Sequence, residues 1–404
     1  MKYLTQKSFE GAFWLGSLKL VIKLFSLVKI VVAARILTPA EIGWFGMIML
    51  PYGLAEVMTE SGINQALVQT SKDAKQYLSS AWIAFIGRGF LISAVLWLIA
   101  PWVSDFFNAG LTDGLRLVAL TPLIKGFVSP AVVLFRKNLE FKKEFTWQAL
   151  ASVAESLGTI ALLLLLKSFI ALPLGVIAGG AAALVLSFVF SRFHWNGVNF
   201  GQIKELYTYG RWVTAGTLTA YVTDQGDDIL VGRVLGAGNL AYYQTAFKIS
   251  NLPTTQGAGI IYQIIFPMFA KIQTDKVRLK RGLIRALAIT LVLSSGFALA
   301  VWLAAPWAVK IIFGETWLPL LPALNVLLLY GIMRPVTSVG AALFDATGKP
   351  QIVLAMGLTR LAILAALIWP LTARWGIVGT SWTVVASQAA ALPLFIYQLK
   401  KTFR

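Results

Sequence analysis

Residues 81–100 read Ala-Trp-Ile-Ala-Phe-Ile-Gly-Arg-Gly-Phe-Leu-Ile-Ser-Ala-Val-Leu-Trp-Leu-Ile-Ala, an apolar run with one charge, at Arg88. About 20 such residues form an α-helix long enough to cross a bilayer. Similar runs recur along the whole chain and predict an all-α polytopic membrane protein with about 12 transmembrane helices. The expected spans are 9–34, 42–68, 77–103, 111–135, 144–166, 169–190, 208–231, 239–270, 284–309, 318–344, 351–372 and 375–398. The first is interpreted as a retained helix, not a cleaved signal peptide.

The composition excludes a soluble protein and several kinds of chemistry. Of 404 residues, 58% are hydrophobic and 13% charged, whereas soluble proteins carry about 25% charged residues. The chain has no cysteine and one histidine, which excludes disulfides, thiol nucleophiles and multi-histidine metal sites. No phosphate-binding GxxxxGK[ST] motif occurs, so ATP is not expected to drive the protein directly. A polymerase usually carries a long periplasmic loop and an acyltransferase needs a membrane histidine, and the predicted spans leave room for neither. We therefore expect no enzyme activity, and we expect no metal or other cofactor.

The basic residues predict the orientation of the chain in the membrane. The chain holds 35 Lys+Arg against 17 Asp+Glu. With the spans above, 19 of the basic residues lie at the termini or in loops on their side, and five lie in loops on the other side. Because basic loops remain cytoplasmic, we expect a multi-pass protein of the inner membrane with both termini in the cytoplasm.

A weak internal repeat predicts two related halves. The sequence Ala-Arg-Ile-Leu at 34–37 returns as Gly-Arg-Val-Leu at 232–235, 198 positions later. Further matches follow in the same order along the chain. Since six spans separate the copies, both halves should enter the membrane the same way round, as a parallel pseudo-repeat. We therefore expect two six-helix bundles, residues 1–200 and 201–404, with a substrate site between them.

Four stretches carry a resemblance to a known family. They are Arg-Ile-Leu-Thr-Pro-Ala-Glu-Ile-Gly-Trp-Phe-Gly at 35–46, Ser-Gly-Ile-Asn-Gln-Ala-Leu-Val-Gln at 61–69, Leu-Phe-Arg-Lys-Asn-Leu-Glu-Phe-Lys at 134–142 and Asp-Ile-Leu-Val-Gly-Arg-Val-Leu-Gly at 228–236. The chain resembles the Wzx-type oligosaccharide flippases of polysaccharide biosynthesis, whose superfamily includes the lipid II flippase and the multidrug-exporting MATE proteins.

The resemblance implies two six-helix bundles around a central cavity. It also implies the flipping of polyprenyl-diphosphate-linked glycans for O-antigen, capsule or exopolysaccharide synthesis. The partners would be that glycan, the bilayer and other polysaccharide-assembly membrane proteins, with no nucleic acid. The alternative is a MATE-like ion-coupled exporter of drugs or small molecules.

Basic residues in the middle of spans are candidates for binding the diphosphate. Lys125 and Arg334 lie 209 positions apart, at equivalent points of the two halves, and are expected on opposite walls of one cavity. An arginine can bind a phosphate through two parallel hydrogen bonds, and a lysine acts as a point charge. Arg88 and Arg360 also lie in mid-span and could strengthen the field. The alternative is that these cations cap kinked helices or extend toward the membrane surface.

Two lysines and two glutamates suggest ion pairs between the first two spans. Lys19 and Lys23 share a helix face, as do Glu56 and Glu60. In antiparallel neighbouring helices these positions fall at equal depths, which predicts the pairs Lys23–Glu56 and Lys19–Glu60. Such pairs could line the cavity and exchange partners during transport, or could be purely structural.

The remaining candidates are an aspartate cluster and several prolines. Asp224, Asp227 and Asp228 share one helix face and could bind H⁺ or Na⁺, coupling its gradient to transport. The alternative is a hydrated structural cluster near the periplasmic end. Pro51 and Pro253 occupy nearly corresponding positions in the two halves and could act as hinges, or could simply shape their helices. Pro122, Pro130 and Pro335 are further possible bends.

Overall fold

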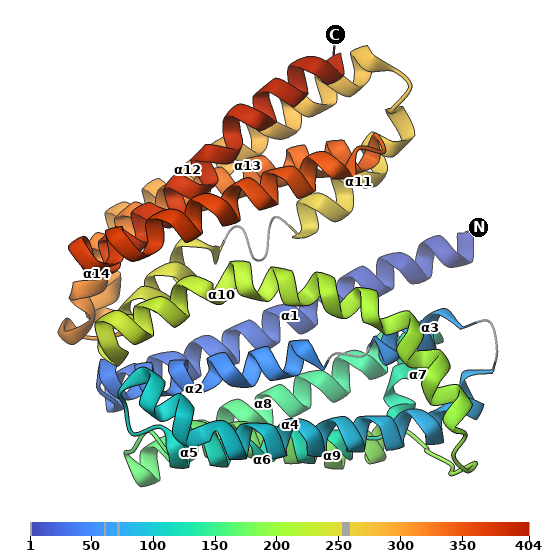
Figure 1. Cartoon of the computed structure of the whole chain (residues 1–404). Coiled ribbons are helices and arrows are strands. Elements are labelled where there is room, and N and C mark those ends of the chain that lie inside the picture. The colour runs from blue at the N-terminus through green and yellow to red at the C-terminus, as the bar shows by residue number, and fades with distance from the viewer. Residues whose placement is uncertain (1, 60–61, 71–72, 253–258, 404) are drawn as a thin grey trace. The chain divides into compact units, whose positions relative to one another are not determined.

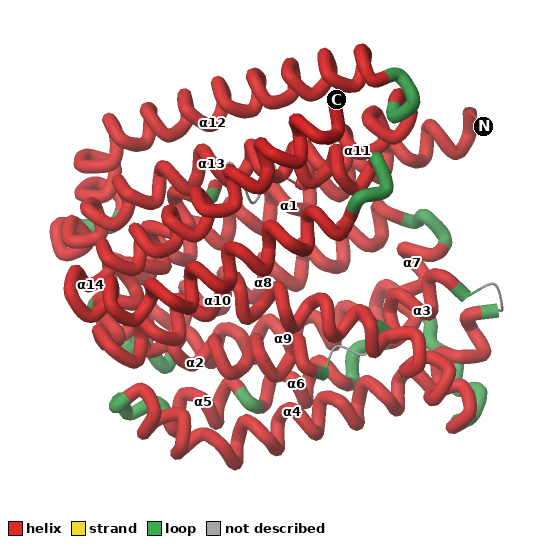
Figure 2. The backbone as a smooth tube through the Cα atoms, turned by 45° about the horizontal axis from the view of Figure 1, so that its top comes forward, coloured by secondary structure: helices red, strands yellow, loops and turns green. Residues whose placement is uncertain are grey.

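The computed structural model describes residues 2–59, 62–70, 73–252 and 259–403. Within these ranges it describes the side chains except those at 2–13, 15–16, 19–20, 204–216, 219–220, 259–264 and 267. Helices joined by short loops make up the described chain, and no strand occurs in it (Figure 2). The prediction of an all-α protein is therefore confirmed.

The chain divides into two compact units, Met1–Gly226 and Asp227–Arg404. The helices that begin in unit 1 are α1 (Lys2–Ile36), α2 (Pro39–Met58), α3 (Ile63–Gln69), η1 (Ala74–Tyr77), α4 (Leu78–Phe107), α5 (Thr112–Val118), α6 (Leu120–Gly126), η2 (Pro130–Val132), α7 (Val133–Lys137), α8 (Phe141–Leu166), α9 (Ala171–Phe190) and α10 (Phe200–Ser250). Those of unit 2 are the rest of α10, then α11 (Gly259–Ile272), α12 (Lys276–Ile312), η4 (Glu315–Leu320), α13 (Leu321–Ala346) and α14 (Pro350–Phe403).

Two long helices are interrupted at a single glycine. Gly236 in α10 has φ 82°, and Gly376 in α14 has φ 58°. This left-handed region is open to glycine at little cost because glycine has no Cβ atom. Each glycine therefore joins two helical segments, which agrees with the expected separation of the spans at 208–231 and 239–270 and at 351–372 and 375–398.

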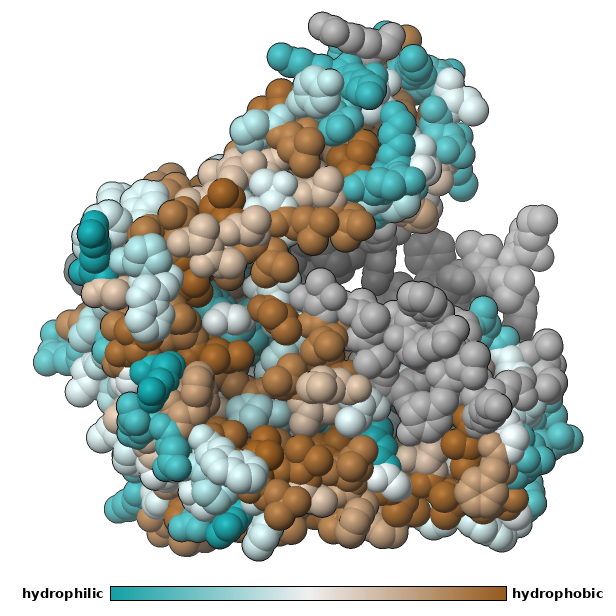
Figure 3. Space-filling view, viewed as in Figure 1, coloured by the Kyte–Doolittle hydropathy of each residue, from teal (hydrophilic) through white to brown (hydrophobic). Residues whose placement is uncertain are grey.

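The described helices have the length and surface of membrane spans. Six of them are long and apolar enough to cross a membrane, or eight if each of two bent helix pairs forms one span. Their large apolar side chains remain exposed, such as Leu98 and Trp102 on α4 and Val292 and Trp307 on α12. Figure 3 shows this pattern for unit 1, where brown apolar residues cover the middle of the visible face along α4 and teal polar residues gather at its ends. The protein is a multi-pass membrane protein.

In unit 1, α8 packs between α1 and α9, and α6 packs against both α4 and α9 (Figure 1). The crossing of α4 and α6 is especially close. A Cβ atom on Gly89 would lie 2.3 Å from the Pro122 carbonyl oxygen, and one on Gly126 would lie 2.9 Å from the Phe85 carbonyl oxygen. An ion pair joins α1 to α8, because Lys29 Nζ lies 2.7 Å from Glu155 Oε1. These contacts hold the helices that surround the candidate site.

The expected span 111–135 is a broken helix. The arm formed by α5 and α6 is bent by 69° from the arm formed by η2 and α7. The break precedes Pro130, and Ser129 is extended there, with ψ 122°, as expected for a residue before a proline. Beyond the break, Lys137 Nζ donates hydrogen bonds to the carbonyls of Leu67 (3.2 Å) and Thr70 (2.7 Å), at the C-terminus of α3. The short helices α3 and α7 are thereby fastened together.

Unit 2 is built around α13, which packs against α11, α12 and α14. Two glycines of α13 allow α10 and α14 to approach it closely. A Cβ atom on Gly331 would lie 2.4 Å from the Ser250 carbonyl oxygen, and one on Gly340 would lie 2.0 Å from the Phe395 ring.

Candidate functional site

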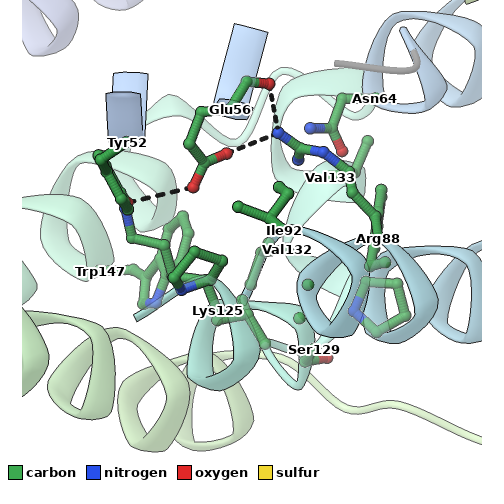
Figure 4. Close-up of a pocket in the computed structure, with 16 residues that line it drawn as sticks. Tyr52, Glu56, Asn64, Arg88, Ile92, Lys125, Ser129, Val132, Val133 and Trp147 are labelled. Atoms are coloured by element: carbon green, nitrogen blue, oxygen red, sulfur yellow. Dashed lines mark hydrogen bonds and ion pairs between the residues drawn. The ribbon is translucent and has the colours of Figure 1, made fainter. Parts of the chain in front are cut away.

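A polar cavity of about 330 Å³ lies within unit 1 (Figure 4). Five helical elements form its walls, namely α2, α3, α4, α6 and α8, together with the η2–α7 turn. Its polar lining residues are Tyr52, Glu56, Asn64, Arg88, Lys125, Ser129 and Trp147. It thus contains three of the charged residues proposed from the sequence, namely Glu56, Arg88 and Lys125.

Arg88 is bound to the C-terminal end of α2. Its Nη2 atom donates to Glu56 Oε2 at 2.6 Å and to the Glu56 carbonyl at 2.8 Å, and its Nε atom donates to Thr59 Oγ1 at 3.1 Å. A cation is favoured here because the last carbonyls of a helix lack backbone partners and carry partial negative charge. Arg88 therefore neutralises Glu56 and also caps α2.

Tyr52 connects Glu56 to Lys125. The Tyr52 hydroxyl donates to Glu56 Oε1 at 3.1 Å and accepts a hydrogen bond from Lys125 Nζ at 2.9 Å. The ammonium also lies 5.6 Å from the centroid of the Tyr52 ring, within the range of a cation–π interaction. A row of hydrogen bonds thus runs from Lys125 through Tyr52 and Glu56 to Arg88.

The charges in this cavity leave one cation in excess. Arg88 and Glu56 form a salt bridge with each other. Lys125 has no carboxylate within 4.0 Å among the residues that the structure describes. Lys125 is exposed, whereas the Arg88 and Glu56 side chains retain 24% and 25% of their accessible surface. The uncompensated positive charge therefore lies on the more open side of the site.

The predicted ion pair between Lys23 and Glu56 is wrong. Glu56 is paired with Arg88 of α4, and no contact between Lys23 and Glu56 is present among the described side chains. The second predicted pair, Lys19–Glu60, lies outside the described residues because neither side chain is described. Of the other lysines of α1, Lys29 is paired with Glu155.

In unit 2, Arg334 and Arg360 meet at one tyrosine. Arg334 Nη1 donates to the Tyr330 hydroxyl at 2.8 Å, and Arg360 Nη2 donates to the same oxygen at 3.3 Å. The Arg360 Nε–H is buried and has no hydrogen-bond partner among the described residues. Two guanidinium groups thus share one hydroxyl oxygen.

The aspartate cluster is only partly buried. Asp227 and Asp228 are buried, whereas Asp224 is exposed. The Tyr243 hydroxyl donates to Asp227 Oδ2 at 2.5 Å, and Gln244 Nε2 donates to Asp228 Oδ2 at 2.9 Å. The rings of Tyr243, Phe247 and Tyr330 contact one another in tilted arrangements, with centroids 5.7–6.1 Å apart, and lead from Asp227 toward the arginine pair.

Of the two predicted hinge prolines, only Pro51 lies within the described residues. Pro51 lies inside α2, directly before Tyr52, whereas Pro253 lies outside the described residues. Sequence reasoning missed Tyr52 and Tyr330, the two tyrosines that hold the cations. Each lies four positions before a charged residue that it contacts, Glu56 and Arg334 respectively. That spacing places both partners on one helix face. It was the feature of the sequence from which these two contacts could have been predicted.

Comparison with known proteins places the chain in a family. The family model "Polysaccharide biosynthesis protein" matches residues 32–322. The lipopolysaccharide biosynthesis protein WzxC of Escherichia coli (strain K12) is 24% identical over 353 residues, which cover 86% of this chain and 72% of WzxC. The teichuronic acid biosynthesis protein TuaB of Bacillus subtilis (strain 168) is 22% identical over 87% of this chain and 74% of TuaB.

Solved structures of the same fold include the lipid II flippase MurJ in an inward closed conformation, with a TM-score of 0.74 and 15% identity over 96% of this chain and 89% of MurJ. An inward-facing multidrug resistance MATE family transporter also gives a TM-score of 0.74, with 13% identity over 94% of both chains. The family is one of transporters, which agrees with the expectation that the chain is not an enzyme. The chain therefore belongs to the polysaccharide biosynthesis family of Wzx-like flippases and has the fold of MurJ and the MATE transporters.

Proposed function

We propose that the protein moves a polyprenyl-diphosphate-linked oligosaccharide across the cytoplasmic membrane by alternating access, for the synthesis of a cell-surface polysaccharide. The observation that carries the proposal is the pair of cations Lys125 and Arg334. They stand at equivalent positions of the repeat, and each is held by a tyrosine hydroxyl, that of Tyr52 or Tyr330. The diphosphate is a multiply charged anion, which is the ligand such cations favour inside a membrane.

The proposal includes twelve spans in two related six-helix halves, residues 1–200 and 201–404, with both termini in the cytoplasm. Left-handed residues at matching positions support the repeat. Leu139 and Gly348 have φ 59° and 72°, and Lys167 and Gly376 have φ 46° and 58°. Each pair lies 209 positions apart, the same spacing as Lys125 and Arg334. A substrate site between two such halves is typical of transporters built from repeats.

The test is complementation of a strain that lacks the protein. The deletion strain should accumulate the lipid-linked glycan on the cytoplasmic side of the membrane. Lys125→Ala and Arg334→Ala should each lower the amount of surface polysaccharide about tenfold or more, because the loss of one charged contact of about 1.5–3 kcal/mol weakens binding by about ten- to a hundredfold. Lys280→Ala and Arg285→Ala, at exposed positions of α12, are the matched controls and should export normally. Full export by both cavity variants would contradict the proposal.

The buried pair Asp227–Asp228 supports coupling to H⁺ or Na⁺ and keeps a second candidate open, a MATE-like exporter of small molecules. Carboxylates inside a membrane are often part of ion pathways. The two functions predict different phenotypes for the deletion strain. An exporter would change the sensitivity of the cells to toxic cations and leave lipid-linked glycan at its normal level, whereas a flippase would do the reverse.

A further inference from the structure

The cavity of unit 1 has the size of a site for a small ligand. Its volume of about 330 Å³ lies at the lower end of the range of about 300–1,000 Å³ found for small-molecule sites. It can hold one or two sugar rings but not an oligosaccharide. Its lining residues come from unit 1 alone, so the cavity is a site in its own right.

The interior of this cavity is unsuited to a diphosphate. The Glu56 carboxylate faces it and already neutralises Arg88 at 2.6 Å. A doubly charged anion placed beside this salt bridge would be repelled by the carboxylate while it competed for the arginine. The single positive charge in excess belongs to Lys125, on the more open side. A phosphate group is therefore favoured near Lys125 and disfavoured deeper in the cavity.

The other polar groups that line the cavity suit sugar hydroxyls instead. A hydroxyl both donates and accepts hydrogen bonds, so it is bound best where donors and acceptors lie side by side. Glu56 supplies acceptors, and Arg88 supplies donors, at adjacent positions. The Asn64 amide supplies both, and among the described residues it makes no hydrogen bond. Figure 4 shows Asn64 next to the Arg88 guanidinium.

An aromatic wall completes the site. Trp147 of α8 lines the cavity, and its indole Nε1 donates to the Ala183 carbonyl of α9 at 3.2 Å. This bond fixes the ring and satisfies its only polar group, which leaves an apolar aromatic surface toward the cavity. The C–H groups of a pyranose ring pack well on such a surface, and a ring that is already fixed loses little entropy on binding.

We propose that this cavity binds the sugar residue that is joined directly to the diphosphate. Lys125 then contacts the adjoining phosphate, and Trp147 packs against the sugar ring. The hydroxyls of the sugar bind Glu56, Arg88 and Asn64. This inference rests on the proposed function, and it assigns the first sugar to a cavity within unit 1 and to named residues there.

The test uses two probes with the purified full-length protein in lipid nanodiscs. One probe is the lipid-linked glycan extracted from the deletion strain, and the other is the sugar-free polyprenyl diphosphate of the same chain length. Titrations give the dissociation constant of each probe for the wild type and for Trp147→Leu, Trp147→Phe and Asn64→Ala. Trp302→Leu, at a tryptophan of α12 that is 53% exposed, is the matched control.

We expect Trp147→Leu to weaken binding of the glycosylated probe about tenfold, equivalent to about 1.4 kcal/mol, and to leave binding of the sugar-free probe unchanged. Unchanged binding of the sugar-free probe also shows that the variant is folded. Trp147→Phe retains an aromatic surface and should keep most of the affinity. Asn64→Ala should weaken binding of the glycosylated probe alone, and Trp302→Leu should change the binding of neither probe.

Equal losses for both probes in Trp147→Leu and Asn64→Ala, or no loss for either, would overturn the sugar site. Failure of the proposed function has a different signature. In that case the deletion strain accumulates no lipid-linked glycan, or the wild type does not bind the sugar-free diphosphate and Lys125→Ala exports normally.

Discussion

At the scale of single residues, Glu56 shows what a sequence can and cannot predict about an ion pair. A glutamate in the middle of an apolar span requires a cation, and that requirement was correctly predicted. The choice of partner was wrong, because equal depth in neighbouring spans points to Lys23 alone. The actual partner, Arg88, lies 32 positions later on α4. Helix packing decides which of several cations at one depth reaches the carboxylate, and a single sequence does not contain that information.

The Glu56–Arg88 pair should show strong coupling in a double-mutant cycle. Loss of either partner leaves the other charge partly buried and unpaired, whereas loss of both partners leaves no unpaired charge. We expect the destabilisation by Glu56→Gln and Arg88→Met to be non-additive by about 1–3 kcal/mol. Thermal unfolding of the purified variants in detergent measures this effect.

The matched cycle pairs Glu56→Gln with Lys23→Met. Because Lys23 makes no contact with Glu56 among the described side chains, these two changes should be additive within about 0.5 kcal/mol. Coupling in the Lys23 cycle, and its absence in the Arg88 cycle, would restore the ion pair predicted from the sequence.

At the scale of helices, apolar runs predict where the elements lie but not how closely they approach. The expected spans at 144–166 and 169–190 agree with α8 and α9, and Lys167 with φ 46° separates them. The span at 111–135 instead breaks before Pro130, one of the prolines that mark possible bends. The contact of Gly89 with the Pro122 carbonyl was not predicted, because hydropathy treats glycine alike wherever it stands in a helix.

Two glycines of α4 provide a direct test of the crossing of α4 and α6. A Cβ atom at Gly89 would lie 2.3 Å from a backbone oxygen, whereas one at Gly87 would have no atom within 4 Å. Gly89→Ala should therefore destabilise the protein by about 1–3 kcal/mol, as overpacking does. Gly87→Ala should be neutral or stabilise it by up to about 1 kcal/mol, because alanine loses less entropy in a helix. Thermal unfolding in detergent, measured side by side, should separate the two variants, and equal midpoints would contradict the close crossing.

At the scale of the whole molecule, the sequence predicted the fold class through composition and periodicity. An apolar content of 58% and long apolar runs can be accommodated only where lipid surrounds the helices. The all-helical, multi-pass character was therefore predictable. The boundary between the two compact units, at Gly226 and Asp227 inside α10, was not predictable, because the apolar pattern gives no signal at that point of the helix.

The proposed orientation can be tested on a chain that has no cysteine of its own. Single cysteines at Gly110 and Thr274, both exposed, should lie on opposite sides of the membrane. In cells with a permeable outer membrane and an intact inner membrane, an impermeant maleimide should label Gly110→Cys. It should label Thr274→Cys only after the inner membrane is permeabilised. Equal labelling of both variants in intact cells would contradict the orientation with cytoplasmic termini.

The two hydrogen bonds from Lys137 to the end of α3 have a mechanical consequence for unit 1. They join α3 to the arm formed by η2 and α7, and Val133 of α7 packs on the same apolar cluster as Leu67 of α3. Separation of α3 from α7 would break both bonds, whereas a joint displacement of the two helices would preserve them. We therefore expect α3 and α7 to move together as one rigid body, pivoting at the helix break before Pro130, and not as two independent helices.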